Sequence, residues 1–138
     1  MTTANMVMGI LDGVSEQIKG KTMLQKIGFI LSREFPGAKE LGNLNYTKYY
    51  YGPFSRKLEE IIDDCQLRGL LMVIPTPVGN VVRYDIAMTE AGKRYAKQSL
   101  PTDSGSLSIM EQMSARAREL NAMDLSQVIE RAYGLLSP

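Results

Sequence analysis

The sequence predicts an α+β fold that is mostly helical and carries a single β-hairpin. Two β-rich runs, residues 70–74 and 81–88, flank a loop that contains two prolines, a glycine and an asparagine. On both sides of these runs, apolar residues recur at every third or fourth position, which is the period of a helix with one buried face. A chain of 138 residues, 44% of them hydrophobic, is long enough to bury a core.

The first two helices are expected within residues 5–35. Residues 5–18 carry apolar side chains at intervals of four, although two glycines interrupt them. The second helix is expected to begin at Thr22, because Thr22 and Gln25 have the spacing of a capping box. Its apolar face follows the i, i+3, i+4 rule as far as Phe35, and Pro36-Gly37 ends it.

Residues 36–52 form a polar connection, within which the tyrosine-rich residues 46–50 are compatible with a short strand. Of the four tyrosines at 46, 49, 50 and 51, we expect two to pack in the core and leave two open for stacking on a partner. Pro53 then has the position that proline favours in the first turn of a helix. This helix is expected to cover residues 53–68, to bury Cys65 as an inert thiol and to end at Gly69.

Further helices are expected after the hairpin. Thr89 has the position of an N-cap for the first of them. Residues 100–105 are linker-like, and Ser108 and Glu111 then have capping-box spacing, as do Asp124 and Gln127 before the last helix. We therefore expect one domain over residues 1–100 and a C-terminal helical extension over residues 101–138, whose heptad-like apolar seam is a candidate for homodimerisation: Met110, Met113, Ala117 and Leu120.

Composition narrows the range of functions. The chain contains no histidine, which removes the commonest general base and transition-metal ligand, so we expect no catalytic residue, metal site or cofactor. Its single cysteine and the absence of a basic, apolar N-terminal segment favour a reducing cytoplasm. No apolar run is long enough to span a bilayer. The formal net charge of +1 permits nucleic-acid binding without arguing for it.

The order helix, hairpin, helix is typical of a winged-helix domain, a fold used mostly to grip duplex DNA. In that interpretation the helix over residues 53–68 enters the major groove and offers Ser55, Arg56 and Lys57 at its first turn. The carboxylates of Glu59 and Glu60 follow directly, so the two cations are equally compatible with ion pairs on a solvated helix face. The remaining candidate phosphate contacts are Lys48, Arg83, Lys93 and Arg94.

The hairpin loop argues for a different partner. Residues 75–80 carry no charge, whereas a wing that grips DNA usually brings a cation. An apolar, proline-containing tip is compatible with contact to a protein, and equally with a rigid turn that contacts nothing. Two hypotheses therefore remain open: a DNA-binding transcriptional regulator acting as a homodimer, and a protein-interaction module on the same scaffold.

Short motifs over about two thirds of the chain resemble two related groups. The run Tyr84-x-Ile86-x-Met88-Thr89-x-x-Gly92 is similar to the wing strand and following helix of PadR- and MarR-like winged-helix regulators. Residues 21–27, with Leu24-Gln25-Lys26, and the later Tyr51-Gly52-Pro53-Phe54-Ser55 resemble SocA-like antitoxins (Panacea) and YwgA-type proteins. Seventeen residues separate Phe35 from Pro53, far more than a standard helix-turn-helix allows, which suits the second group better. That resemblance implies partners that are proteins as readily as DNA.

Overall fold

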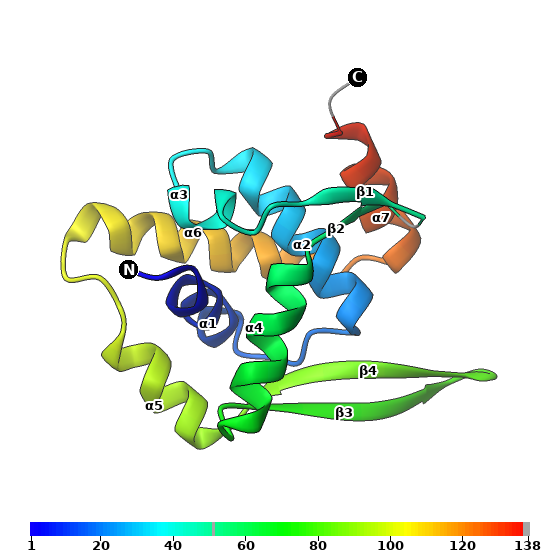
Figure 1. Ribbon diagram of the computed structural model, residues 1–138, viewed down its shortest axis with the longest axis horizontal. Coiled ribbons are helices and arrows are strands. Elements are labelled where there is room, and N and C mark those ends of the chain that lie inside the picture. Colours follow the sequence, from blue (N-terminus) through cyan, green and yellow to red (C-terminus); the bar gives the residue numbers. More distant parts are fainter. Residues whose placement is uncertain (51, 137–138) are drawn as a thin grey trace.

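The computed structural model describes residues 1–50 and 52–136, in which helices and two antiparallel hairpins alternate (Figure 1). The chain is α+β, as the sequence predicts. The elements follow in the order α1 (Thr3–Val14), α2 (Lys21–Glu34), α3 (Lys39–Gly42), β1 (Thr47–Tyr49), β2 (Gly52–Phe54), α4 (Arg56–Leu67), β3 (Leu71–Val78), β4 (Val81–Met88), α5 (Glu90–Gln98), α6 (Ser104–Asn121) and α7 (Leu125–Gly134).

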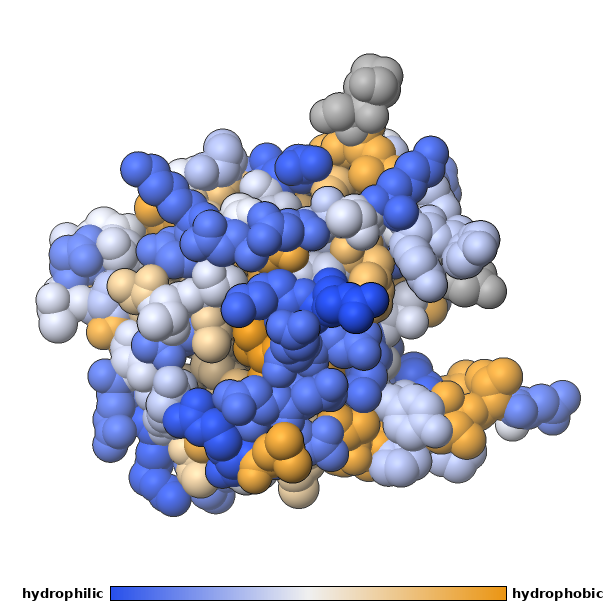
Figure 2. Space-filling model, in the orientation of Figure 1, coloured by the Kyte–Doolittle hydropathy of each residue, from blue (hydrophilic) through white to orange (hydrophobic). Residues whose placement is uncertain are grey.

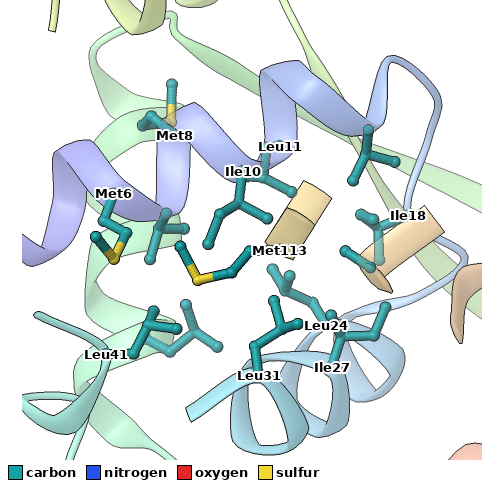
Figure 3. Close-up of a cluster of buried hydrophobic side chains, with 14 of the residues drawn as sticks. Met6, Met8, Ile10, Leu11, Ile18, Leu24, Ile27, Leu31, Leu41 and Met113 are labelled. Atoms are coloured by element: carbon teal, nitrogen blue, oxygen red, sulfur yellow. The ribbon is translucent and has the colours of Figure 1, made fainter. Parts of the chain in front are cut away.

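The core lies between α1, α2 and α6. Ile10, Leu31 and Met113 are buried there, one from each helix (Figure 3). The two glycines within α1 face α6, and a methyl group on Gly13 would overlap the side chain of Ser114. These glycines let the two helices approach closely, which offsets their low helix propensity. The C-terminal helices therefore share one core with the N-terminal ones.

The first helix is shorter than predicted. It ends at Val14 because Ser15 adopts a left-handed conformation with φ of 61°. Ile18 lies outside the helix and forms a two-way backbone bridge with Ile86 of β4. The predicted start of α2 was also wrong, since its N-cap is Gly20 and makes no side-chain cap hydrogen bond. Thr22 lies within the first turn, exposed to solvent.

The prolines occupy strands, where the sequence predicted a helix turn and a loop. Pro53 pairs with Lys48 in the β1–β2 hairpin, and α4 begins only after the N-cap Ser55. Pro75 and Pro77 lie within β3, so the loop of the long hairpin shrinks to Gly79 and Asn80. The β3–β4 hairpin consequently extends well beyond the body of the molecule (Figure 1), and we call its distal part, residues 74–85, the arm.

The helix caps that follow the hairpin were predicted with mixed success. The Thr89 side chain accepts from the Gly92 N–H at 3.0 Å, which confirms the predicted cap of α5. The capping box of Asp124 and Gln127 at α7 is also confirmed. At α6, however, the cap is Asp103 and the helix begins at Ser104, so the predicted start at Ser108 is wrong. No helix among the described residues is long and apolar enough to cross a membrane.

Candidate functional site

The first turn of α4 presents two of the three DNA contacts that are predicted for it. Arg56 and Lys57 are exposed. Ser55 is fully buried, because its hydroxyl donates to the carbonyl of Leu44 and accepts from the Leu58 N–H at 3.0 Å. The expectation that Ser55 contacts DNA is therefore corrected. Its hydroxyl is buried and already makes hydrogen bonds that cap the helix and anchor the preceding loop.

The other predicted cations are scattered over the molecule. Arg83, on the arm, donates to Asp85 through two nitrogens at 2.7 and 3.0 Å. Lys93 forms an exposed pair with Glu90 on α5. The guanidinium of Arg68, at the end of α4, lies 5.2 Å from the ring centroid of Tyr95, which places α5 beside that end of the helix.

Distance and intervening charge separate these cations from the first turn of α4. The twelve residues of α4 span about 18 Å, so Lys93 and Arg94 lie at the opposite end from Arg56 and Lys57. The exposed face between the two ends is acidic and contains Glu59, Glu60, Asp63 and Asp64. Lys48 is exposed on β1, and Figure 1 shows β1 and α5 on opposite sides of the molecule. The predicted DNA-contacting cations do not form one continuous surface.

The predicted dimerisation seam is not on the surface. Met110, Met113, Ala117 and Leu120 are each at most 4% exposed in the single chain, and α6 packs them against α1 and α2. This corrects the expectation of a seam between copies. The heptad-like spacing is real, but it reflects packing within the chain, because two helices that pack in one monomer need the same apolar stripe as two helices in a dimer.

An apolar groove of about 450 Å³ opens between α2, α4, α7 and the β1–β2 hairpin. Its floor is formed by Ile62 and Ile86, which are 3% and 2% exposed. Its outer wall comes from α7, where Leu125 is 37% exposed. Further apolar side chains that line it are Leu24, Phe54, Leu58 and Ile129.

Charged groups stand on opposite walls of the groove. Lys21 and Lys26 of α2 line one side, and Glu59 and Asp63 of α4 line the other. Lys26 is only 3% exposed, and its ammonium donates to the carbonyl of Pro53 at 2.9 Å. Burial lowers the pKa of Lys26 from its ordinary value. The groove therefore combines an apolar floor with rim charges of both signs.

Gln25 fixes the geometry of the groove. Its side-chain amide donates to the Ser55 carbonyl and accepts from the Ser55 N–H, both at 2.8 Å. This reciprocal pair, entirely buried, ties α2 to the start of α4. Gln25 had been predicted to cap its own helix, which is wrong, since the side chain points across to the neighbouring element.

Two aromatic side chains, Tyr49 and Phe54, line the groove. Tyr49 packs on Tyr50 with ring centroids 5.2 Å apart and on Phe54 at 5.7 Å. Tyr49 and Tyr50 are 58% and 86% exposed, whereas Tyr46 packs edge-on against Phe29 and its hydroxyl is buried without a hydrogen-bond partner in the described part of the chain. Burial raises the pKa of Tyr46 far above its ordinary value. Tyr51 lies outside the described residues.

Neither Gln25 nor Lys26 was predicted as a site residue. Both lie off the apolar stripe of α2, so periodicity assigns them to the solvent side, yet both are buried. The only signal was their place in the Leu24-Gln25-Lys26 run that carries the resemblance to SocA-like proteins. Within residues 1–50 and 52–136, no three acidic or cysteine side chains are placed to hold a metal ion.

Comparison with known proteins adds no assignment. No family model matches the chain, and no curated protein gives a significant match.

Proposed function

We propose that this chain is a protein-interaction module on a winged-helix scaffold, with the groove as its docking site. The observation that carries the proposal is the apolar groove with charges of both signs on its rim. Concave, largely apolar sites with a few placed polar groups are the ordinary form of binding pockets in proteins. The partner is a short amphipathic segment of another protein, with apolar side chains on the floor, a carboxylate toward α2 and a cation toward α4.

The winged-helix part of the proposal is supported by element order. The helix α4 is followed by the β3–β4 hairpin and α5, and the backbone bridge between Ile18 and Ile86 adds a third, one-residue strand beside β4. The insertion of α3 and the β1–β2 hairpin between α2 and α4 supplies one wall of the groove. This insertion is the feature that departs from a simple helix-turn-helix.

A second candidate function is binding to duplex DNA through the first turn of α4. Arg56 and Lys57 favour it, since both are exposed at a helix N-terminus, where the helix dipole also attracts phosphate. The acidic face that follows these two residues along α4, and the uncharged tip of the arm, argue against DNA binding. Figure 2 shows the hydrophilic surface around α4 and the apolar side chains on the arm.

A photo-crosslinking amino acid at Leu125 tests the docking site in cells that express the full chain. Leu125, at the rim of the groove, is 37% exposed, and Ile109 on α6 is 38% exposed but does not line the groove, which makes it a matched control. We expect a discrete covalent adduct with another protein from position 125 and none from position 109. Adding Ile129→Glu in the groove should abolish the adduct. Equal crosslinking at both positions, or none at 125, would contradict the proposal.

Fluorescence anisotropy with random-sequence duplex DNA tests the second candidate. DNA binding predicts a dissociation constant of about 10⁻⁴–10⁻⁶ M that weakens steeply with added salt and is lost in the double variant Arg56→Glu/Lys57→Glu. The groove variant Ile129→Glu is the control and should leave DNA binding unchanged. Salt-dependent DNA binding together with no adduct at position 125 would favour the DNA function over the docking function.

A further inference from the structure

The hydrogen bonds of Ile86 show in which direction the backbone N–H and C=O groups of each β4 residue point. Its N–H donates to the Ile18 carbonyl at 3.0 Å, and its carbonyl accepts from the Ile18 N–H at 2.9 Å. Both backbone groups of Ile86 therefore point away from β3. Because these groups alternate in direction along an antiparallel strand, those of Tyr84 and Val82 also point away from β3.

The same alternation shows that the outer edge of β3 is blocked. Pro75 pairs with Tyr84 and Pro77 with Val82, so the backbone nitrogen and carbonyl of both prolines point away from β4. Proline has no N–H, and the edge of β3 therefore lacks two successive donors. Proteins use prolines in this way to stop an exposed strand from pairing with another chain.

The outer edge of β4 has no such protection. Among the described residues, no backbone group hydrogen-bonds to the outward N–H and C=O of Val82 and Tyr84. Val82 and Tyr84 are 52% and 49% exposed, and Val81 is 64% exposed. An unpaired, apolar strand edge of this kind is a template for the addition of another strand.

The arm carries almost no net charge, which allows two copies of the same β4 edge to pair. Between Leu71 and Tyr84 the hairpin contains a single charged residue, Arg83. Its guanidinium is held by Asp85, which is 4% exposed and also accepts from the Thr76 hydroxyl at 3.1 Å. The pair is neutral within each chain, so two copies of β4 lie side by side without repulsion between like charges.

We propose that this edge is a homodimer interface, in which β4 of one copy pairs with β4 of a second copy. A two-fold axis perpendicular to the sheet makes the two strands antiparallel and produces a four-stranded sheet in the order β3, β4, β4, β3. The pairing satisfies the outward groups of Val82 and Tyr84 and covers apolar side chains that are exposed in the single chain. A two-stranded hairpin is marginal alone, and four strands are stable.

The blocked edge makes this assembly closed. Each copy offers one open edge, on β4, and uses it in the dimer, while Pro75 and Pro77 leave the outer edges of the four-stranded sheet without outward N–H groups along the arm. Further strand addition along the arm would find no outward N–H on β3 and is therefore disfavoured. The interface involves the arm and not the docking groove, so the proposal stands independently of the proposed function.

Sedimentation velocity of the full chain, with two substitutions at one position, tests the interface. Val82→Pro removes an outward N–H that the hairpin itself does not use, and Val82→Thr keeps this N–H and the β-branched shape. We expect the unaltered protein and Val82→Thr to sediment as dimers, and Val82→Pro to be monomeric at the same concentration. A monomer at every concentration for the unaltered protein, or a dimer that persists in a folded Val82→Pro variant, would overturn the proposal.

Amide hydrogen exchange gives a readout that does not depend on any variant folding. In the dimer, the Val82 and Tyr84 amides are hydrogen-bonded between copies, so their exchange should be slow and should accelerate as the protein is diluted to monomers. The amide of Ile86, bonded to Ile18 within the chain, is the internal control and should stay slow on dilution. Fast exchange at Tyr84 in a sample that sediments as a dimer would place the interface elsewhere.

Discussion

Gln25 joins two elements that are distant in the sequence through one side chain. Among the described residues, its amide is the sole partner of the buried Ser55 N–H, and it also contacts the Ser55 carbonyl. A buried amide that loses its acceptor pays the full cost of leaving water. The start of α4, and with it one wall of the groove, therefore depends on this side chain.

We expect Gln25→Ala to lower the free energy of unfolding by about 2–3 kcal/mol, because two buried hydrogen bonds are lost and the Ser55 N–H is left unpaired. Thr22→Ala is the control, since Thr22 is exposed and makes no cap, and its effect should stay within about 0.5 kcal/mol. Urea unfolding at neutral pH measures both. A larger loss for Thr22→Ala than for Gln25→Ala would restore the capping-box interpretation.

Single residues were predictable from the sequence where their role is local. The caps at Thr89 and Asp124 and the burial of Cys65 all follow from neighbours within a few positions. Residues with distant partners were not predictable in the same way. Ser55 at the start of α4 looks identical in sequence whether it faces DNA or the loop at Leu44, and only the folded chain distinguishes the two.

At the scale of elements, the base of the hairpin is clamped by a close contact with α5. Gly92 faces the carbonyl of Leu70, and an added methyl group would overlap that oxygen. The same carbonyl accepts from the Thr89 N–H at 3.2 Å, so it has little freedom to move. The first turn of α5 and the beginning of β3 are consequently held together backbone to backbone.

Gly92→Ala should lower the free energy of unfolding by about 1–3 kcal/mol, because a backbone atom has to shift to make room. Gly134→Ala, in a helix with no heavy atom within 4 Å of the added methyl group, should be neutral or stabilise by up to about 1 kcal/mol. Thermal unfolding followed by circular dichroism compares the two variants. A stable Gly92→Ala variant would mean that α5 is able to shift away from the hairpin.

The existence of most elements was predictable from apolar periodicity, whereas their ends were less so. Prolines account for two of the errors: Pro53 at a helix start and Pro75 and Pro77 in a loop are the common interpretations, yet all three lie in strands. Each sits in a two-stranded hairpin, which has no central strand and therefore tolerates a missing donor. The sequence around a proline does not reveal whether a partner strand exists on its other side.

At the scale of the whole molecule, Glu34 connects three helices. Its carboxylate accepts from Arg116 of α6 at 2.8 and 3.2 Å and from Arg131 of α7 at 2.8 Å. The hydrogen bond from Arg116 is the main cause that holds the pKa of Glu34 below its ordinary value. On the arm, the hydrogen bond from Arg83 lowers the pKa of Asp85 in the same manner. Through Glu34, ion pairs join residues that are more than eighty positions apart in the sequence.

Because both carboxyl groups have lower pKa values in the folded than in the unfolded chain, their contribution to stability is complete above the unfolded values and disappears as pH falls through the folded values. We therefore expect the free energy of unfolding to be level near neutral pH and to decline below about pH 4. The double variant Glu34→Gln/Asp85→Asn should be less stable at pH 7 and show a shallower decline. Urea titrations at several pH values measure this, and parallel curves would contradict it.

The arrangement of α6 against α1 was not predictable from the sequence, although its apolar stripe was. A stripe specifies that a helix face is buried and does not identify what covers it, so Met110, Met113, Ala117 and Leu120 were equally compatible with a dimer. In the folded chain α1 covers this stripe, because its small residues Gly9 and Gly13 make room for Met110 and Ser114 of α6. Recognising that match requires knowing that the two helices meet.

The buried Cys65 makes the protein its own reporter of local opening. It is the only cysteine in the sequence, it is 2% exposed on the inner face of α4, and burial raises the pKa of its thiol. A thiol reagent therefore modifies the chain only when α4 lifts from the core. Under conditions in which reclosing is faster than labelling, the rate of modification measures the population of that opened state. A ligand that bridges α4 and α7 in the groove would slow this reaction, which offers a way to rank candidate partners without engineering the chain.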